Sequence, residues 1–174
     1  LTRKIVLLLR YLASEHDVSY SGDEMLFEIL HFDWFGIPSL EVAKLSVEAA
    51  EKRYSGDKTS MRRLLAEKAA APPKDLFSTG LHPGLIKASA VIEQLMSDVS
   101  NFSLRQLFDQ LVREAGVLTH IMQSPDKHWQ LEMLTALYDF IKDETHRNPL
   151  LSLEGLVNLI DMMEHEGISL PLVQ

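Results

Sequence analysis

Apolar residues recur along the chain at the three- and four-residue spacing of amphipathic helices, and no segment alternates apolar with polar residues over the length of a strand. In the first segment Ile5, Leu8, Leu9 and Leu12 predict a helix over about 2–16. Seven more helices are predicted to begin close to residues 21, 39, 59, 83, 103, 124 and 152. The pattern therefore predicts an all-α fold, with about eight helices in a compact irregular bundle. The third helix is expected to bury five apolar residues: Leu40, Val42, Ala43, Leu45 and Val47.

Serine residues mark several of the predicted helix starts. A serine hydroxyl at the cap position accepts a hydrogen bond from an unpaired N–H group of the first helical turn. Ser21 with Glu24, and Ser103 with Gln106, have the spacing of a capping box. Ser39 is the predicted cap of the third helix.

The strongest break in the helical pattern is Ala71-Pro72-Pro73, because proline lacks an N–H donor and disfavours helical geometry in the residue before it. A chain of 174 residues is long enough to bury a core of its own. We therefore predict one helical domain over 1–174, with subclusters 1–72 and 83–174 joined by a loop over 73–82.

Three aromatic residues, Phe32, Trp34 and Phe35, crowd the segment HFDWFGIPSLEVAKL between the second and third helices. Two interpretations are open. The rings stack on exposed bases, as in proteins that bind single strands, or they fill the corner between two helices. The second is the expectation for a helical protein, and Trp129 is expected in the core in the same way.

The composition excludes several classes of site. The chain has no cysteine, which excludes disulfides, thiolate catalysis and the common zinc fingers, and which fits a reducing compartment. No apolar run approaches the roughly 18 residues that span a bilayer, so we expect a soluble, cytoplasmic protein without a membrane partner. Because the chain begins with Leu1 rather than Met, we also expect it to be a domain of a longer protein.

The net charge of −8 disfavours wholesale nucleic-acid binding, because Lys and Arg supply most of the affinity for phosphate. The charge is uneven, however. Residues 44–74, the basic strip, hold eight Lys and Arg residues against four Asp and Glu residues, a net +4 that leaves −12 for the rest. Such a strip is either a local basic face or an ordinary solvated helix surface.

No motif for catalysis is present. Gly80 and Gly84 are followed by no G-K-[ST], so there is no P-loop, and no serine lies in a G-x-S-x-G elbow. The seven histidines lack the H-x-x-x-H and H-E-x-x-H spacings of helical metal sites. We therefore expect no catalytic residue, no metal and no cofactor in this chain.

The order of these elements resembles the accessory domain 2B of superfamily 1 DNA helicases of the UvrD/Rep/PcrA group. The resemblance covers nearly the whole chain. It rests on a YL helix, an FEIL helix, a Gly-Ile turn entering a helix, a basic stretch and the run LIKASAVIEQLMSDVSNFSLRQLFDQLVREAGVL. The turn over 114–118, the helix over 129–141 and the LSLEGL segment at 151–156 are similar to later elements of that domain.

The resemblance implies a non-catalytic domain of an ATP-dependent DNA helicase or helicase–nuclease. The motor domains of the same chain would flank it and hold ATP and Mg²⁺, so the two termini of this segment should lie close together. It further implies weak, sequence-independent contact with the backbone of duplex DNA, and regulation of the motor as the domain swivels.

In that family the contact is a Gly-Ile-Gly turn before a helix, where unpaired N–H donors and the helix dipole bind a phosphate. Gly36 and Ile37 match its first two positions, whereas Pro38 departs from the third and removes one donor. Ser39 is the replacement candidate, through its hydroxyl and its amide, and Lys44 would add charge. The implied DNA-binding residues are thus Gly36, Ile37, Ser39 and Lys44.

A rival class stays open from the sequence: a helical protein-interaction module that docks another subunit. The acidic net charge favours this rival, whereas the basic strip favours DNA.

Overall fold

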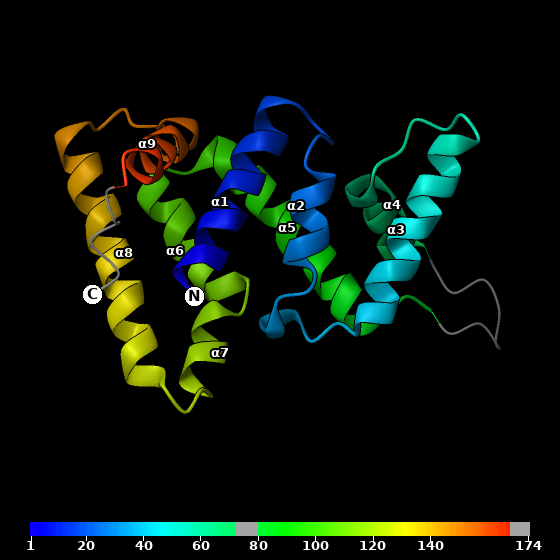
Figure 1. The fold of residues 1–174 in the computed structure, drawn as a ribbon, viewed down its shortest axis with the longest axis horizontal. Helices are drawn as coiled ribbons and strands as arrows, with labels where there is room; N and C mark the ends of the chain where they lie inside the picture. Colours follow the sequence, from blue (N-terminus) through cyan, green and yellow to red (C-terminus); the bar gives the residue numbers. More distant parts are fainter. Residues whose placement is uncertain (72–79, 168–174) are drawn as a thin grey trace.

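The computed structural model describes residues 1–71 and 80–167, and it confirms the all-α prediction (Figure 1). These residues form nine α-helices and one 3-10 helix and contain no strand. None of the described helices is long and apolar enough to cross a membrane. In chain order the elements are α1 (Thr2–Asp17), α2 (Asp23–Ile29), η1 (Asp33–Phe35), α3 (Ser39–Tyr54), α4 (Met61–Ala70), α5 (Pro83–Asn101), α6 (Leu104–Glu114), α7 (Val117–Met122), α8 (Lys127–Arg147) and α9 (Leu153–His165).

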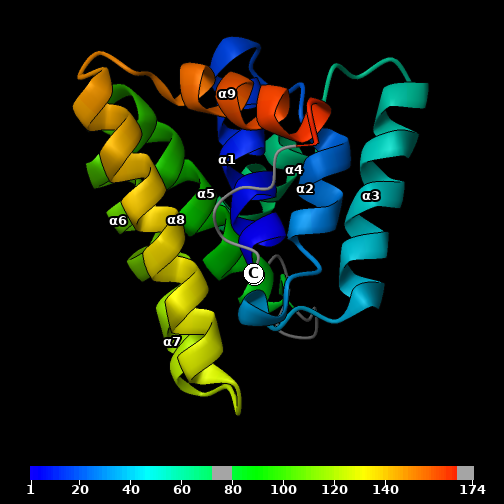
Figure 2. The ribbon, with the colours of Figure 1, turned by 60° about the vertical axis from the view of Figure 1, so that its left-hand side comes forward.

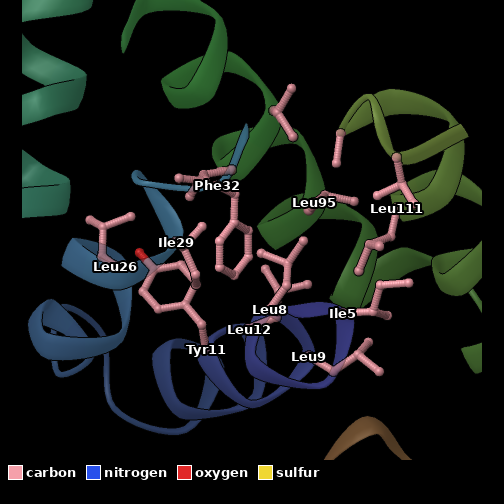
Figure 3. Close-up of a cluster of buried hydrophobic side chains, with 14 of the residues drawn as sticks. Ile5, Leu8, Leu9, Tyr11, Leu12, Leu26, Ile29, Phe32, Leu95 and Leu111 are labelled. Carbon is pink, nitrogen blue, oxygen red and sulfur yellow. The ribbon is translucent and has the colours of Figure 1, made fainter. Parts of the chain in front are cut away.

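Helix α1 lies at the centre of the molecule, where it contacts α2, α5, α8 and α9 (Figures 1 and 2). Its apolar side faces the core, and Figure 3 shows these side chains turned toward residues of α2, α5 and α6. The guanidinium of Arg10 also donates to Asp161 and Glu164 of α9. The described chain therefore ends beside the helix with which it begins. Five residues of α1 are completely buried: Ile5, Leu8, Leu9, Tyr11 and Leu12.

Most of the predicted loop over 73–82 falls within 72–79, which lies outside the described residues. The division into two subclusters stays a prediction.

Of the three predicted serine caps, that of Ser103 is confirmed and those of Ser39 and Ser21 are wrong. The capping box of Ser103 and Gln106 is complete, and Ser152 accepts from the N–H of Gly155 at 3.1 Å. Ser39, however, is the first residue of α3, with Pro38 at the cap position and no side-chain hydrogen bond there.

The predicted capping box of Ser21 and Glu24 is also wrong, because a distant carboxylate takes its place. Helix α2 has Gly22 at the cap position and no side-chain cap of its own. The carboxylate of Glu15, in α1, accepts the N–H groups of Gly22 and Tyr20 instead. A contact from α1 thus supplies the acceptor for the N–H of the cap residue, which a capping box assigns to the third helical residue.

Four side chains expected in the core are on the surface, and Ala43 of α3 is one of them. Leu40 and Val47 of α3 are 64% and 56% exposed, and Trp129 of α8 is 47% exposed. In both views of the ribbon α3 forms an outer edge of the molecule (Figures 1 and 2), and it contacts α4. Only one side of α3 therefore meets the body, and Val42, Leu45 and Ala49 occupy it: these three are buried.

A buried ionic network joins α1, α4 and α5. The side chain of Glu15 is completely buried, and the guanidinium of Arg62 donates to it at 3.1 Å. Arg62 also donates to both carboxylate oxygens of Glu93, at 2.9 and 3.0 Å, and the ring of Tyr20 lies 5.0 Å from its guanidinium carbon. Hydrogen bonding to Glu93 raises the pKa of Arg62 above its ordinary value, so the side chain stays cationic.

Candidate functional site

The turn between η1 and α3 uses part of its backbone for its own geometry. The N–H of Gly36 donates to the carbonyl oxygen of Asp33 at 3.1 Å and closes the 3-10 turn. Gly36 has φ +62°, in the left-handed region that glycine adopts at no steric cost. Pro38 has no N–H, and its carbonyl accepts from Glu41 at 3.0 Å. Gly36 and Pro38 therefore shape the turn without offering a donor.

Three amides of the turn have no acceptor among the described residues: those of Ile37, Ser39 and Leu40. Ser39 and Leu40 form the start of α3, where N–H groups lack an intrahelical partner and the helix dipole adds partial positive charge. Ser39 is exposed. The donors available to a ligand are thus the amides at positions 37, 39 and 40, and the sequence-based hypothesis had not included Leu40.

The aromatic residues before the turn fill a corner of the core. Phe32, Trp34 and Phe35 are all buried, and the rings of Phe32 and Trp34 meet edge to face with centroids 4.9 Å apart. The corner interpretation is confirmed. Buried rings offer no face to a base, so the stacking interpretation is wrong.

The turn rests directly on the start of α5. A Cβ added to Gly84 would lie 2.8 Å from Cγ1 of Ile37 and 2.9 Å from the carbonyl oxygen of Phe35. The N–H of Gly84 donates to Nδ1 of His82, which caps α5. The absence of a side chain at position 84 therefore allows the two segments to touch.

Cationic and imidazole groups from three helices gather at this corner. Nζ of Lys4 lies 5.7 Å and 5.9 Å from the ring centroids of Phe32 and Trp34, and 3.8 Å from the carboxylate of Asp33. The ring of His120 lies 6.1 Å from that of Trp34. Sequence reasoning missed these neighbours, because Lys4 and His120 are far from the turn along the chain and no local pattern marks them.

The side chain of Lys87, in α5, approaches the same corner. Its Nζ lies 3.8 Å from a Cβ built on Gly116, and the carbonyl oxygen of Trp34 lies 3.6 Å from that point. Lys4 and Lys87 thus bring two positive charges to the corner from which the turn emerges.

Of the four predicted DNA-binding residues, Lys44 does not lie with the other three in the turn. It lies five positions beyond Ser39, and the α-helical repeat places it about 140° around the axis of α3. Its Nζ is 3.6 Å from the carboxylate of Glu41, which offsets part of its charge. The exposed Lys44 can add to the potential near the turn, but it lies on another side of the helix.

The basic strip is largely paired. Within it Lys68 bonds Glu48 at 2.7 Å, and Arg63 lies 3.4 Å from Glu67. Three other cations of the strip, Lys44, Arg53 and Arg62, pair with four acidic residues outside it, Arg62 with two of them. The structure thus favours the interpretation as an ordinary helix surface. The four partners are Glu15, Asp23, Glu41 and Glu93.

A hollow of about 510 Å³ lies between α1, α6 and the connection from α8 to α9. His16, Arg105 and His146 are among its lining residues, but Arg105 already donates to the hydroxyl of Tyr138 at 3.2 Å. Across residues 1–71 and 80–167, no three His, Asp or Glu side chains are grouped so that they could hold a metal ion. The turn over 36–40 therefore remains the candidate site.

Comparison of the chain with protein-family models, with curated proteins and with solved structures found no match, so the resemblance to domain 2B rests on the sequence pattern.

Proposed function

We propose that this chain is a non-catalytic accessory domain of an ATP-dependent DNA helicase, which contacts the backbone of duplex DNA through phosphates and regulates the motor. The motor domains of the same protein would bind ATP and Mg²⁺ and would work in the cytoplasm. The fold supports this proposal because the described chain returns to its first helix, as an insertion between two motor segments must do.

The observation that carries the proposal is that the amides of Ile37, Ser39 and Leu40 have no acceptor within residues 1–71 and 80–167. Phosphate oxygens accept hydrogen bonds from such amides at the start of a helix, and this contact carries no sequence information. Lys4 and Lys87 add positive charge at the adjoining corner. The net charge of −8 limits the contact to this small area, so binding should be weak.

The proposal predicts sequence-independent duplex binding with a Kd of roughly 10⁻⁴ to 10⁻⁶ M at moderate salt. Gly36→Asp combined with Lys44→Glu should weaken this binding at least about tenfold and lower the salt slope by about one. A Cβ at position 36 meets no neighbour within 4 Å, and Asp tolerates the left-handed φ of this position better than most residues, so the new carboxylate acts mainly by repelling the phosphate. Fluorescence anisotropy of a labelled duplex, measured over a salt series, gives both quantities.

A matched control is Gly56→Asp combined with Lys142→Glu. Gly56 also has positive φ and open space, and Lys142 is exposed on α8, so the charge change and the type of position are the same. The control should bind like the unaltered chain. Equal loss in both variants would show that only the net charge matters and would contradict the assignment of the turn.

A second candidate function, the protein-interaction module, is favoured by the outer face of α3. Three large apolar side chains, Leu40, Val47 and Tyr54, are exposed on this helix. Exposed apolar groups that lie in line on one helix are typical of a contact with another helix.

A further inference from the structure

The outer face of α3 carries a continuous apolar stripe with the spacing of a coiled-coil seam. Leu40, Val47 and Tyr54 follow one another at intervals of seven residues, and Ala43 and Ala50 lie three residues after the first two. All five side chains are exposed, with Tyr54 at 96%. This is the pattern of a and d positions over two heptads.

The stripe lies nearly opposite the side of α3 that meets the body. Its five residues fall within about 80° of one another around the helix axis, and the buried residues Val42, Leu45 and Ala49 centre about 145° away. No described residue covers the stripe, since α4 contacts the other side and α3 forms an outer edge of the molecule (Figures 1 and 2). The helix is thus held in place and presents a second apolar face.

We propose that this stripe is a self-association surface, through which two copies of the chain pair by antiparallel contact of their α3 helices. The proposal goes beyond the proposed function and does not depend on it. Two independent features of the stripe, the size and the charge of its residues, match this occupant.

Size matches because large and small residues alternate along the seam. In an antiparallel pair each a position packs against a d position of the other helix. The two helices can be aligned so that Tyr54 of one copy lies against Ala43 of the other. In this alignment, or register, Val47 of each copy lies against Ala50 of the other. Alanines opposite larger side chains let the helices approach closely at these levels, and Leu40 lies beyond the paired length of α3.

Charge matches in the same register. The residues that flank the seam are Lys44 and Glu51 on one side and Ser46 and Arg53 on the other. Antiparallel pairing places Lys44 of each copy beside Glu51 of the other, which gives two ion pairs related by the two-fold axis. A parallel pair would instead set Lys44 beside Ser39 and Glu51 beside Ser46, with no opposite charges in contact.

The association should be weak, because two heptads bury little area. Helix α3 is already formed and held by its inner side, so pairing orders only the exposed side chains. We expect a Kd of the order of 0.1 mM.

Sedimentation velocity of the 174-residue chain without DNA, from about 10 µM to 1 mM, tests the proposal. The mean mass should rise from 19.7 kDa toward twice that value as concentration increases. Val47→Glu should keep the chain monomeric over the whole range, because it places two charges in the seam. Val47 is exposed, so thermal unfolding followed by circular dichroism should remain as in the unaltered chain.

An exchange of charges tests the register. Lys44→Glu alone, or Glu51→Lys alone, sets like charges against each other in both flanking pairs and should weaken association about tenfold. An equimolar mixture of these two variants should associate again, because each new charge then faces an opposite charge in the other chain. A partner of another kind at this stripe would not give this recovery.

Three results would overturn the proposal: a monomer at 1 mM, association that persists in Val47→Glu, or a mixture of the charge variants that associates no better than either one. These measurements contain no DNA. Their failure leaves the phosphate contact of the turn untouched. Because Lys44→Glu appears in both tests, Gly36→Asp alone separates them: it leaves the stripe unaltered, so a loss of duplex binding in this variant says nothing about pairing of α3.

Discussion

Arg62→Met is expected to lower the free energy of unfolding by about 3–5 kcal/mol, because it removes one partner of a buried ion pair. Arg62 is the cation that faces the completely buried carboxylate of Glu15, and its own side chain is 12% exposed. Its removal leaves a charge in the core with two backbone donors and no counterion. Urea unfolding followed by circular dichroism gives the difference.

The neighbouring Arg63→Ala is the matched control. Arg63 is exposed and pairs with Glu67 on the same helix, so its loss should change the free energy of unfolding by less than about 0.5 kcal/mol. Adding Glu15→Gln to Arg62→Met should recover at least about 1 kcal/mol, because the buried charge is then gone. A double variant no more stable than Arg62→Met would show that the ion pair is not the source of the loss.

Gly84→Ala is expected to destabilise the fold by about 1–3 kcal/mol, although alanine is the better helix former. The new Cβ would meet the carbonyl oxygen of Phe35 at 2.9 Å and Cγ1 of Ile37 at 2.8 Å. Backbone cannot move aside as a flexible side chain can, so the turn or α5 must shift. Urea unfolding measures the stability, and duplex binding should weaken in parallel as the turn moves.

Gly80→Ala provides the control, because a Cβ at position 80 meets nothing within 4 Å. This variant should be as stable as the unaltered chain or more stable by up to about 1 kcal/mol, through a smaller entropy of the unfolded state. A Gly84→Ala variant as stable as Gly80→Ala would mean that the turn does not rest on α5.

Helix positions were predictable because their signals are local. The apolar spacing of α1 and the capping box at Ser103 depend on neighbours in the sequence, and both are confirmed. The separate helix α7 was not predicted. It begins immediately after Gly116, a residue type that more often ends a helix than begins one.

The sequence-based predictions were wrong where a residue of another helix supplies the expected hydrogen-bond acceptor, or where no neighbouring helix covers an apolar side chain. Glu15 supplies the acceptor at the start of α2, and nothing in the spacing of Ser21 shows this. Leu40 and Val47 fit a helical period, but a period does not say which of two apolar sides of α3 meets the body. A helix with apolar residues on two sides is ambiguous until its neighbours are known.

The candidate site was only partly predictable. The bend at Gly36 and the missing donor of Pro38 follow from residue type. The amide of Gly36 is used within η1, and this depends on the 3-10 hydrogen bond to Asp33, which residue type alone does not give. The approach of Lys4 and Lys87 depends on the packing of α1 and α5 and has no signature in the sequence.

The contact of Gly84 with Phe35 and Ile37 also has a mechanical consequence. It joins the bend to α5, a rod of 19 residues that runs into the central core. A load applied to the bend would pass along this rod to α1 and from there to α9, without stretching a flexible segment. A ligand bound at the bend would therefore transmit force through α5 to α1, the first helix of the chain.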